Sequence, residues 1–230
     1  FNITDAGETL RFRFPLGMEA RRETKEVALR VPTDAEVSAQ GDLAVAVGIV
    51  PTGAPVNPNA PTVRYVLRGA SGSLPASDNR QSATVSPAPA DERETAIVVS
   101  AKPLPDAAGV SVFAKPEDAP APLQAYLRPT DYVSSGDPVF WQLATQAVGG
   151  ETDLAKAAAK IAAFVHAAIK PDSSIAALRT ASDIEKDRRG VCREYTTFYA
   201  AVARAAGIPT RVCVGVVWNG EQFVYHAWPE

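Results

Sequence analysis

Prolines divide this chain of 230 residues into two unequal parts, because 15 of the 19 lie at or before Pro129. The proline-rich part also carries alternating apolar and polar residues, as where Leu10 and Phe12 alternate with Arg11 and Arg13. Such alternation is typical of a half-buried strand. Several short strands joined by turns predict a β-sandwich domain over residues 1–114, with a structural or binding role. The further strand-like runs are 26–31, 43–50, 63–68, 96–100 and 110–114.

The segment 115–129 is rich in proline and alanine, and we interpret it as a linker. After the linker the apolar residues recur at helical spacing, so residues 130–230 are expected to form a second domain. Because the β-sandwich would be followed by this largely helical second domain, the expected fold class is α+β. The expected helices are 138–148 after the cap Asp137, 152–170 opened by Thr152, 182–189 capped by Ser182 and ended by Gly190, and 192–206 ahead of Gly207.

The last part of the chain predicts a β-hairpin. Two apolar, β-branched runs, 210–218 and 221–228, are joined by an Asn-Gly pair at 219–220, the strongest short-range hairpin signal. A two-residue turn there would place Cys213 directly opposite His226. Because opposed residues share a face of a sheet, Cys213 is expected to pack beneath the His226 imidazole.

Composition excludes several classes of function. No run of about 18 apolar residues is present, so a membrane-spanning helix is not expected. A net charge of -3 gives no basic footprint for nucleic acid. Two cysteines are too few for a disulfide scaffold. Two histidines leave little room for a His-rich metal site, so a metal site ranks last among the interpretations. No cofactor is implied. An exported location, either periplasmic or secreted, is favoured. The oligomeric state is left open.

Two residues are candidates for chemistry. Cys192 follows Gly190 and stands at the first turn of an expected helix, where free N–H groups stabilise a thiolate. The alternative for Cys192 is a small buried hydrophobe. His226 lies in the second hairpin strand and could activate that thiol, although a packed strand histidine is the commoner case. The other histidine, His166, is interpreted as a residue on the flank of an amphipathic helix.

Three linked motifs then carry a resemblance to a known family. They are Gly190-Val-Cys-Arg-Glu, Arg204-Ala-Ala-Gly-Ile-Pro-Thr-Arg211 and His226-Ala-Trp-Pro-Glu230. In this order they resemble the core of the transglutaminase-like superfamily, and the lead-in is similar to bacterial members described as candidate cysteine proteases. The resemblance covers residues from about 125 to 230. It implies a papain-like domain whose nucleophile is Cys192 and whose general base is His226.

The resemblance also implies a triad aspartate on the next strand. The sequence ends at Glu230, before such a strand, so the domain is expected to be incomplete at its C-terminus. The implied reaction is acyl transfer from an amide of a peptide or protein: water as acceptor makes a protease or amidase, and an amine makes a transglutaminase. Hydrolysis is favoured. The alternative from another class is a non-catalytic binding or scaffold protein that retains the fold.

The remaining expectations concern supporting residues. Arg204 and Arg211 flank the Gly-Ile-Pro turn, and an ion pair that holds the turn, with Glu194 as a partner, is preferred over substrate contact. The backbone N–H of Cys192 is the natural oxyanion donor. Cys192 is expected to react before Cys213, because desolvation in an apolar strand raises the pKa of a thiol.

Overall fold

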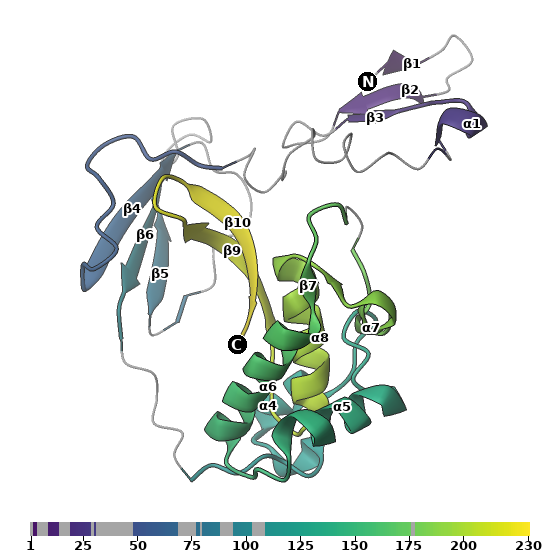
Figure 1. The fold of residues 1–230 in the computed structure, drawn as a ribbon. Coiled ribbons are helices and arrows are strands. Elements are labelled where there is room, and N and C mark those ends of the chain that lie inside the picture. Colours follow the sequence, from purple (N-terminus) through teal and green to yellow (C-terminus); the bar gives the residue numbers. More distant parts are fainter. Residues whose placement is uncertain are drawn as a thin grey trace. The chain divides into compact units, whose positions relative to one another are not determined.

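The computed structural model describes residues 2–3, 9–13, 19–28, 30, 48–68, 77–78, 80–87, 94–102, 109–175 and 178–230. The chain divides into two compact units. One comprises Pro51–Ala107, and the other comprises Phe1–Val50 together with Ala108–Glu230. Each unit is described by itself below (Figure 1).

The smaller unit contains one antiparallel sheet of three strands in the order β4-β6-β5. β4 is Thr62–Arg68, β5 is Gln81–Val85 and β6 is Glu94–Ser100. The strands expected at 63–68 and 96–100 are therefore confirmed. β5 was not predicted, because its sequence Gln-Ser-Ala-Thr-Val lacks the apolar alternation that marks a half-buried strand.

The N-terminal segment contains a second sheet, with the order β1-β2-β3. Its strands are Asn2–Ile3, Thr9–Arg13 and Glu19–Arg21. The strand expected at 26–31 is wrong at its start, where a one-turn helix α1 spans Lys25–Ala28. The Thr24 hydroxyl accepts a hydrogen bond from the Val27 N–H at 3.4 Å, which favours that turn over an extended chain.

A single sandwich over residues 1–114 is not confirmed, since the two sheets belong to different units. Of the strand expected at 43–50, residues 43–47 lie outside the described residues, and Ile49 forms an isolated antiparallel bridge with Phe223. Within 110–114 the structure has only an isolated bridge, between Ser111 and Asp153.

The segment 115–129 differs from the predicted linker, because it folds as three helical turns. These are η2 at Pro116–Asp118, α4 at Ala121–Gln124 and η3 at Ala125–Leu127. Pro116 and Pro122 occupy first-turn positions, where a missing N–H costs nothing. Ala119 and Leu127 are buried, so the segment packs as part of the larger unit.

Four longer helices follow, close to the predicted ranges. They are α5 at Pro138–Val148, α6 at Leu154–Ala168, α7 at Ala181–Asp187 and α8 at Cys192–Ala205. The predicted caps were displaced in two of them. Asp153 rather than Thr152 caps α6. α7 is capped by Thr180 and ends at Arg188 in the left-handed conformation, ahead of Gly190.

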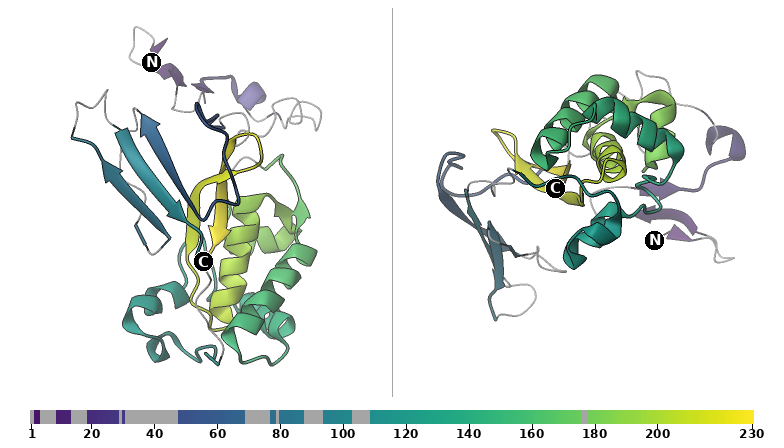
Figure 2. Two further views of the ribbon diagram at one scale, coloured as in Figure 1. Left: turned by 90° about the vertical axis from the view of Figure 1, so that its left-hand side faces the viewer. Right: turned by 90° about the horizontal axis from the view of Figure 1, so that it is seen from below.

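α8 is the central helix of the larger unit. Its residues Phe198 and Ala200–Ala203 are fully buried. The Phe198 ring meets Phe140 of α5 edge-on, with centroids 5.7 Å apart. Ile161 and Val165 bring α6 into the same core. Figure 2 shows α8 among these helices with the C-terminal hairpin along one side.

The hairpin consists of β9 at Val212–Trp218 and β10 at Phe223–Pro229. Its loop has four residues, 219–222, so the expected two-residue turn is wrong. The Asn219 side-chain oxygen accepts hydrogen bonds from the N–H groups of Glu221 and Gln222, at 3.0 and 2.9 Å. This local bonding holds Asn219 out of the positive φ that a type I′ turn requires.

The pairing of the hairpin is consequently shifted by two positions. Cys213 lies opposite Trp228, and His226 lies opposite Gly215. Because side chains alternate with period 2, a shift of two keeps Cys213 and His226 on the same face. The shared face was therefore predicted correctly and the direct opposition was not.

Candidate active site

Cys192 is the first residue of α8, as the sequence predicts. Its N–H has no acceptor within the helix, since the first N–H groups of a helix lack intrahelical partners. Its side chain is free and half-buried. A thiolate here would face the positive end of the α8 dipole, and the Cys192 N–H could bind a developing oxyanion.

Glu194 organises the turn that leads into α8. Its side chain is 1% exposed, and its Oε2 accepts the Val191 N–H at 2.9 Å. The side chain lies directly over Gly190: a Cβ there would be 2.2 Å from Glu194 Cβ. Position 190 must therefore be glycine so that the chain can pass beneath the carboxylate. The resulting tight turn fixes where Cys192 starts the helix.

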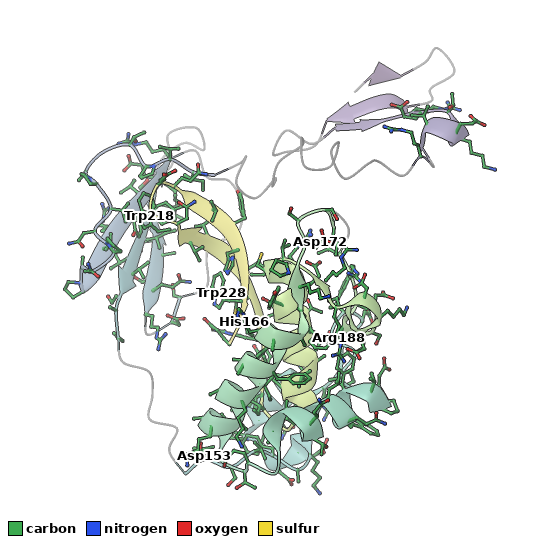
Figure 3. The ribbon with its side chains drawn as sticks, in the orientation of Figure 1. Asp153, His166, Asp172, Arg188, Trp218 and Trp228 are labelled. Atoms are coloured by element: carbon green, nitrogen blue, oxygen red, sulfur yellow. The ribbon has the colours of Figure 1, made fainter. Side chains whose placement is uncertain are left out.

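A second carboxylate braces the same turn from the other side. β7 (Lys170–Pro171) pairs in parallel with β8 (Arg189–Gly190), and the N–H of Asp172 donates to Gly190 O at 2.9 Å. Figure 3 shows Asp172 in the loop after β7. Its Oδ1 accepts two hydrogen bonds from Ser174, at 2.6 and 3.0 Å. Asp172 Oδ2 is buried and lies 2.7 Å from Arg189 Nη2, in an ion pair without hydrogen-bond alignment.

These bonds hold the pKa of Asp172 below its ordinary value, with the Ser174 hydroxyl as the largest cause and the Arg189 charge as a smaller one. Sequence reasoning missed Asp172. The sequence Asp-Ser-Ser at 172–174 could have indicated it. In such a turn the aspartate carboxylate accepts a hydrogen bond from the backbone N–H two residues ahead.

His226 is exposed in β10, and β10 is the strand that packs most against α8. Its ring is stacked beside the Trp228 ring, with centroids 6.5 Å apart and planes at 16°. The indole of Trp228 covers Gly215, where an added Cβ would meet it at 2.8 Å. No hydrogen bond joins Cys192 to His226 within the described residues.

The other histidine and cysteine lie elsewhere. His166 is exposed in the last turn of α6 (Figure 3). Cys213 is free and half-buried in β9, and its pKa is raised, first by burial and then by the Glu230 carboxylate. The raised pKa agrees with the prediction for Cys213.

The arginines flanking the Gly-Ile-Pro turn do not bind Glu194, which corrects the expected ion pair. Arg204 donates to two backbone carbonyls, those of Thr210 at 2.9 Å and Arg128 at 2.6 Å. Arg211 instead pairs with Glu230, through Nε at 2.9 Å and Nη2 at 2.5 Å. Glu194 instead forms an ion pair with the adjacent Arg193, at 3.8 Å.

Glu230 links the two strand ends of the hairpin. Besides Arg211, its carboxylate accepts a hydrogen bond from the Trp228 indole at 3.0 Å. These two donors, Trp228 first, lower the pKa of Glu230. These contacts give Glu230 a structural role at the open end of the hairpin.

A cavity lies near this site, and the described residues contain no group suited to a metal. The cavity measures about 420 Å³ and is bounded by α8, η3 and the hairpin, but neither Cys192 nor His226 lines it. No three His, Cys, Asp or Glu side chains lie close enough to hold a metal ion in the part of the chain that the structure describes. None of the described helices is long and apolar enough to cross a membrane.

Comparison with known proteins identifies the C-terminal part of the chain. No curated protein matches. Two solved structures are weakly similar, each with a TM-score of 0.49: a candidate cysteine protease from Cytophaga hutchinsonii and the periplasmic domain of TgpA from Pseudomonas aeruginosa bound to ethylmercury. The first is 18% identical over 74% of this chain and 67% of its own. The second is 19% identical over 75% and 68%.

Residues 142–230 match the family model of the transglutaminase-like superfamily. The matched region contains all three motifs that suggested the family, with Cys192 at a helix start and His226 in a strand packed on that helix. Residues 142–230 are therefore similar to the transglutaminase-like superfamily.

Proposed function

We propose that Cys192 and His226 act together in thiol-dependent acyl transfer on an amide, with hydrolysis of a peptide-like substrate favoured over transamidation. The observation that carries the proposal is the position of Cys192 at the first residue of α8, inside the region that matches the family. Packing of β10 on α8 supports His226 as the partner. An exported location accompanies this proposal.

The reaction divides into two half-reactions. His226 takes the proton of the Cys192 thiol while the sulfur attacks the amide carbonyl, and the Cys192 N–H donates to the oxyanion. The C–N bond then breaks, the imidazolium gives its proton to the leaving amine, and a thioester remains on Cys192. Attack by water, with His226 again as base, releases a carboxylic acid and restores the thiol. Attack by an amine would instead form a new amide.

A direct test is to trap the acyl-enzyme. The chain is incubated with the p-nitrophenyl ester of N-acetylglycine, and the acylated residue is located by mass spectrometry after digestion. We expect the acyl group on Cys192 and none in Cys192→Ala. His226→Asn should slow acylation at neutral pH about 100-fold, the usual contribution of a general base.

Matched controls separate these effects from a change in folding. Cys213→Ala and His166→Asn carry the same substitutions at positions outside the proposed pair, and both should acylate at the wild-type rate. Acylation of Cys213, or an equal rate in Cys192→Ala, would refute the proposal. Adding glycinamide to the trapped thioester then compares hydrolysis with transamidation.

A non-catalytic binding role is the second candidate, and one observation favours it. The cavity beside α8 excludes both Cys192 and His226 from its lining. If Cys192 fails to acylate while a ligand still binds in that cavity, the binding role replaces the enzymatic one.

A further inference from the structure

The cavity beside α8 has the size and lining of a small-molecule site. Its volume of about 420 Å³ lies within the usual range for such sites, roughly 300–1,000 Å³. Half of its fourteen lining residues are apolar or aromatic, and they come from η3, the loop after it, the loop before α7, and the hairpin. They include Tyr126, Tyr132, Leu178, Val212, Val214 and Ala227.

Four arginines and one glutamate also line the cavity, and their charges almost balance against nearby acids. The three balanced pairs are Arg179 with Asp187 at 2.8 Å, Arg193 with Glu194 at 3.8 Å, and Arg211 with Glu230 at 2.5 Å. The fourth arginine, Arg204, has no carboxylate within ion-pair distance in the part of the chain that the structure describes. The cavity therefore retains one uncompensated positive charge.

Arg204 is 8% exposed, so this charge is almost fully withdrawn from water. Its Nε and Nη1 donate to the Thr210 and Arg128 carbonyls, and its Nη2 donates to no described residue. Burial lowers the pKa of Arg204, and no acid acts against it. An unpaired buried cation is costly, and a carboxylate oxygen would accept a charge-assisted hydrogen bond from the remaining Nη2 donors.

We propose that this cavity binds an apolar molecule carrying one carboxylate, and that its occupant is the carboxyl end of a peptide. One unmatched charge fits a monoanion, and the aromatic and aliphatic walls fit the side chains next to it. Arg193 and Glu194 directly follow Cys192 in α8, so the cavity begins one residue from the proposed nucleophile. The choice of a peptide as the source rests on the proposed function, whereas binding of the carboxylate does not.

The first experiment compares three probes by titration calorimetry with the full chain. These are N-acetyl-leucyl-leucine, its C-terminal amide, and N-acetyl-leucyl-glutamate with its α-carboxyl amidated. All titrations use Cys192→Ala, so that neither turnover nor acylation affects the result. The acid should bind at least about tenfold more tightly than the amide, the usual effect of losing a charged hydrogen bond. The glutamate probe, whose carboxylate is on a side chain, should also bind more weakly than the acid.

A pair of variants locates the site. Val214 lines the cavity and is 79% exposed, so Val214→Trp should fold normally and fill the space. Val216 lies two residues further along the same face of β9, is 42% exposed and does not line the cavity. Val214→Trp should weaken binding of the acid at least about tenfold, and Val216→Trp should leave it unchanged.

Arg204→Gln provides the charge test where circular dichroism shows a native fold, and it should bind the acid and the amide equally. If it does not fold, the Val214 and Val216 variants decide. Equal binding of acid and amide by Cys192→Ala, no binding of either, or an unchanged affinity in Val214→Trp would overturn the proposal. Tighter or equal binding of the glutamate probe would overturn the peptide end as occupant. Loss of acylation with retained binding would refute only the proposed enzyme.

Discussion

Each end of α8 has a glycine and a charged side chain that bonds to the backbone. At the start of the helix the first backbone N–H groups have no acceptor within the helix, whereas backbone carbonyls at its end are hydrogen-bonded. At the start, the Glu194 carboxylate accepts one N–H and folds over Gly190, and the N–H and half-buried sulfur of Cys192 remain free of that contact. At the end, Arg204 donates to two carbonyls, and Gly207 lies against the backbone of another segment.

The start of α8 is therefore suited to a reaction at Cys192, whereas the end of α8 holds the next segment in place. A reacting thiol needs unsatisfied donors and access, which cost stability. The turn after α8 instead sets the direction in which β9 leaves the helix. Its residues Ile208 and Thr210 are buried, and the Thr210 hydroxyl donates a hydrogen bond to the Ile208 carbonyl. Substitutions at the two ends should therefore differ in what they damage.

The largest effect is expected at the anchoring end. Gly207 has φ +81°, and an added Cβ would lie 2.1 Å from the carbonyl oxygen of Phe113, whose N–H donates to Gly207 O. Gly207→Ala combines left-handed strain with a clash against backbone, so it should destabilise the fold by about 3 kcal/mol or more. Urea denaturation measures the change.

Gly150 is the matched control for Gly207. Its φ of +82° is nearly identical, but nothing lies within 4 Å of an added Cβ. Gly150→Ala should therefore cost only the conformational strain, about 1 kcal/mol. Equal losses in the two variants would mean that packing on Phe113 contributes nothing.

Gly190→Ala should cost less, about 2 kcal/mol, because Gly190 lacks the left-handed φ of Gly207, although its added Cβ would lie 2.2 Å from Glu194 Cβ. Moving Glu194 aside would also shift the start of α8. We expect slower alkylation of Cys192 by iodoacetamide in the folded variant, with the rate for Cys213 unchanged. If Cys192 in this variant is alkylated at the wild-type rate, the turn does not position the thiol.

Asp172→Asn tests the second brace of the same turn and should cost about 1–2 kcal/mol at neutral pH. The pKa of Asp172 is lowered in the folded state, so its contribution is present above the unfolded value of about 3.9 and is lost as pH falls through the folded value. The stability difference between wild type and variant should thus shrink below about pH 4. A difference that persists unchanged at pH 2–3 would contradict the assigned role of the carboxylate. Ser173→Ala, beside it in the loop, is the control.

The smallest effect is expected for Cys213→Ala, under about 1 kcal/mol, since the residue is only half-buried. Its raised pKa keeps the thiol protonated above the ordinary value of about 8.5. Iodoacetamide at pH 7 should consequently modify Cys192 before Cys213, and alkylation of Cys213 should rise only at higher pH. Faster labelling of Cys213 at pH 7 would contradict the assignment of Cys192, at the start of α8, as the more reactive thiol.

Local signals in the sequence correctly determined several elements of this protein. Asp137 followed by Pro138 set the start of α5, and Gly207 set the end of α8. The Cys192 position at a helix start and the shared hairpin face of Cys213 and His226 also followed from the sequence. Caps, glycines and the period of side chains act within a few residues, so a short window contains the cause.

The other features were decided by bonds that form only in the folded chain. The proline-rich segment 115–129 packs instead of linking, because Arg204, 76 residues further on, bonds the Arg128 carbonyl. The hairpin register depends on how Asn219 bonds its own loop, and no residue pattern in β9 or β10 reveals that choice. The partners of Arg204, and with them the unmatched charge in the cavity, could not be predicted, because burial and the absence of a nearby acid are properties of the assembled fold.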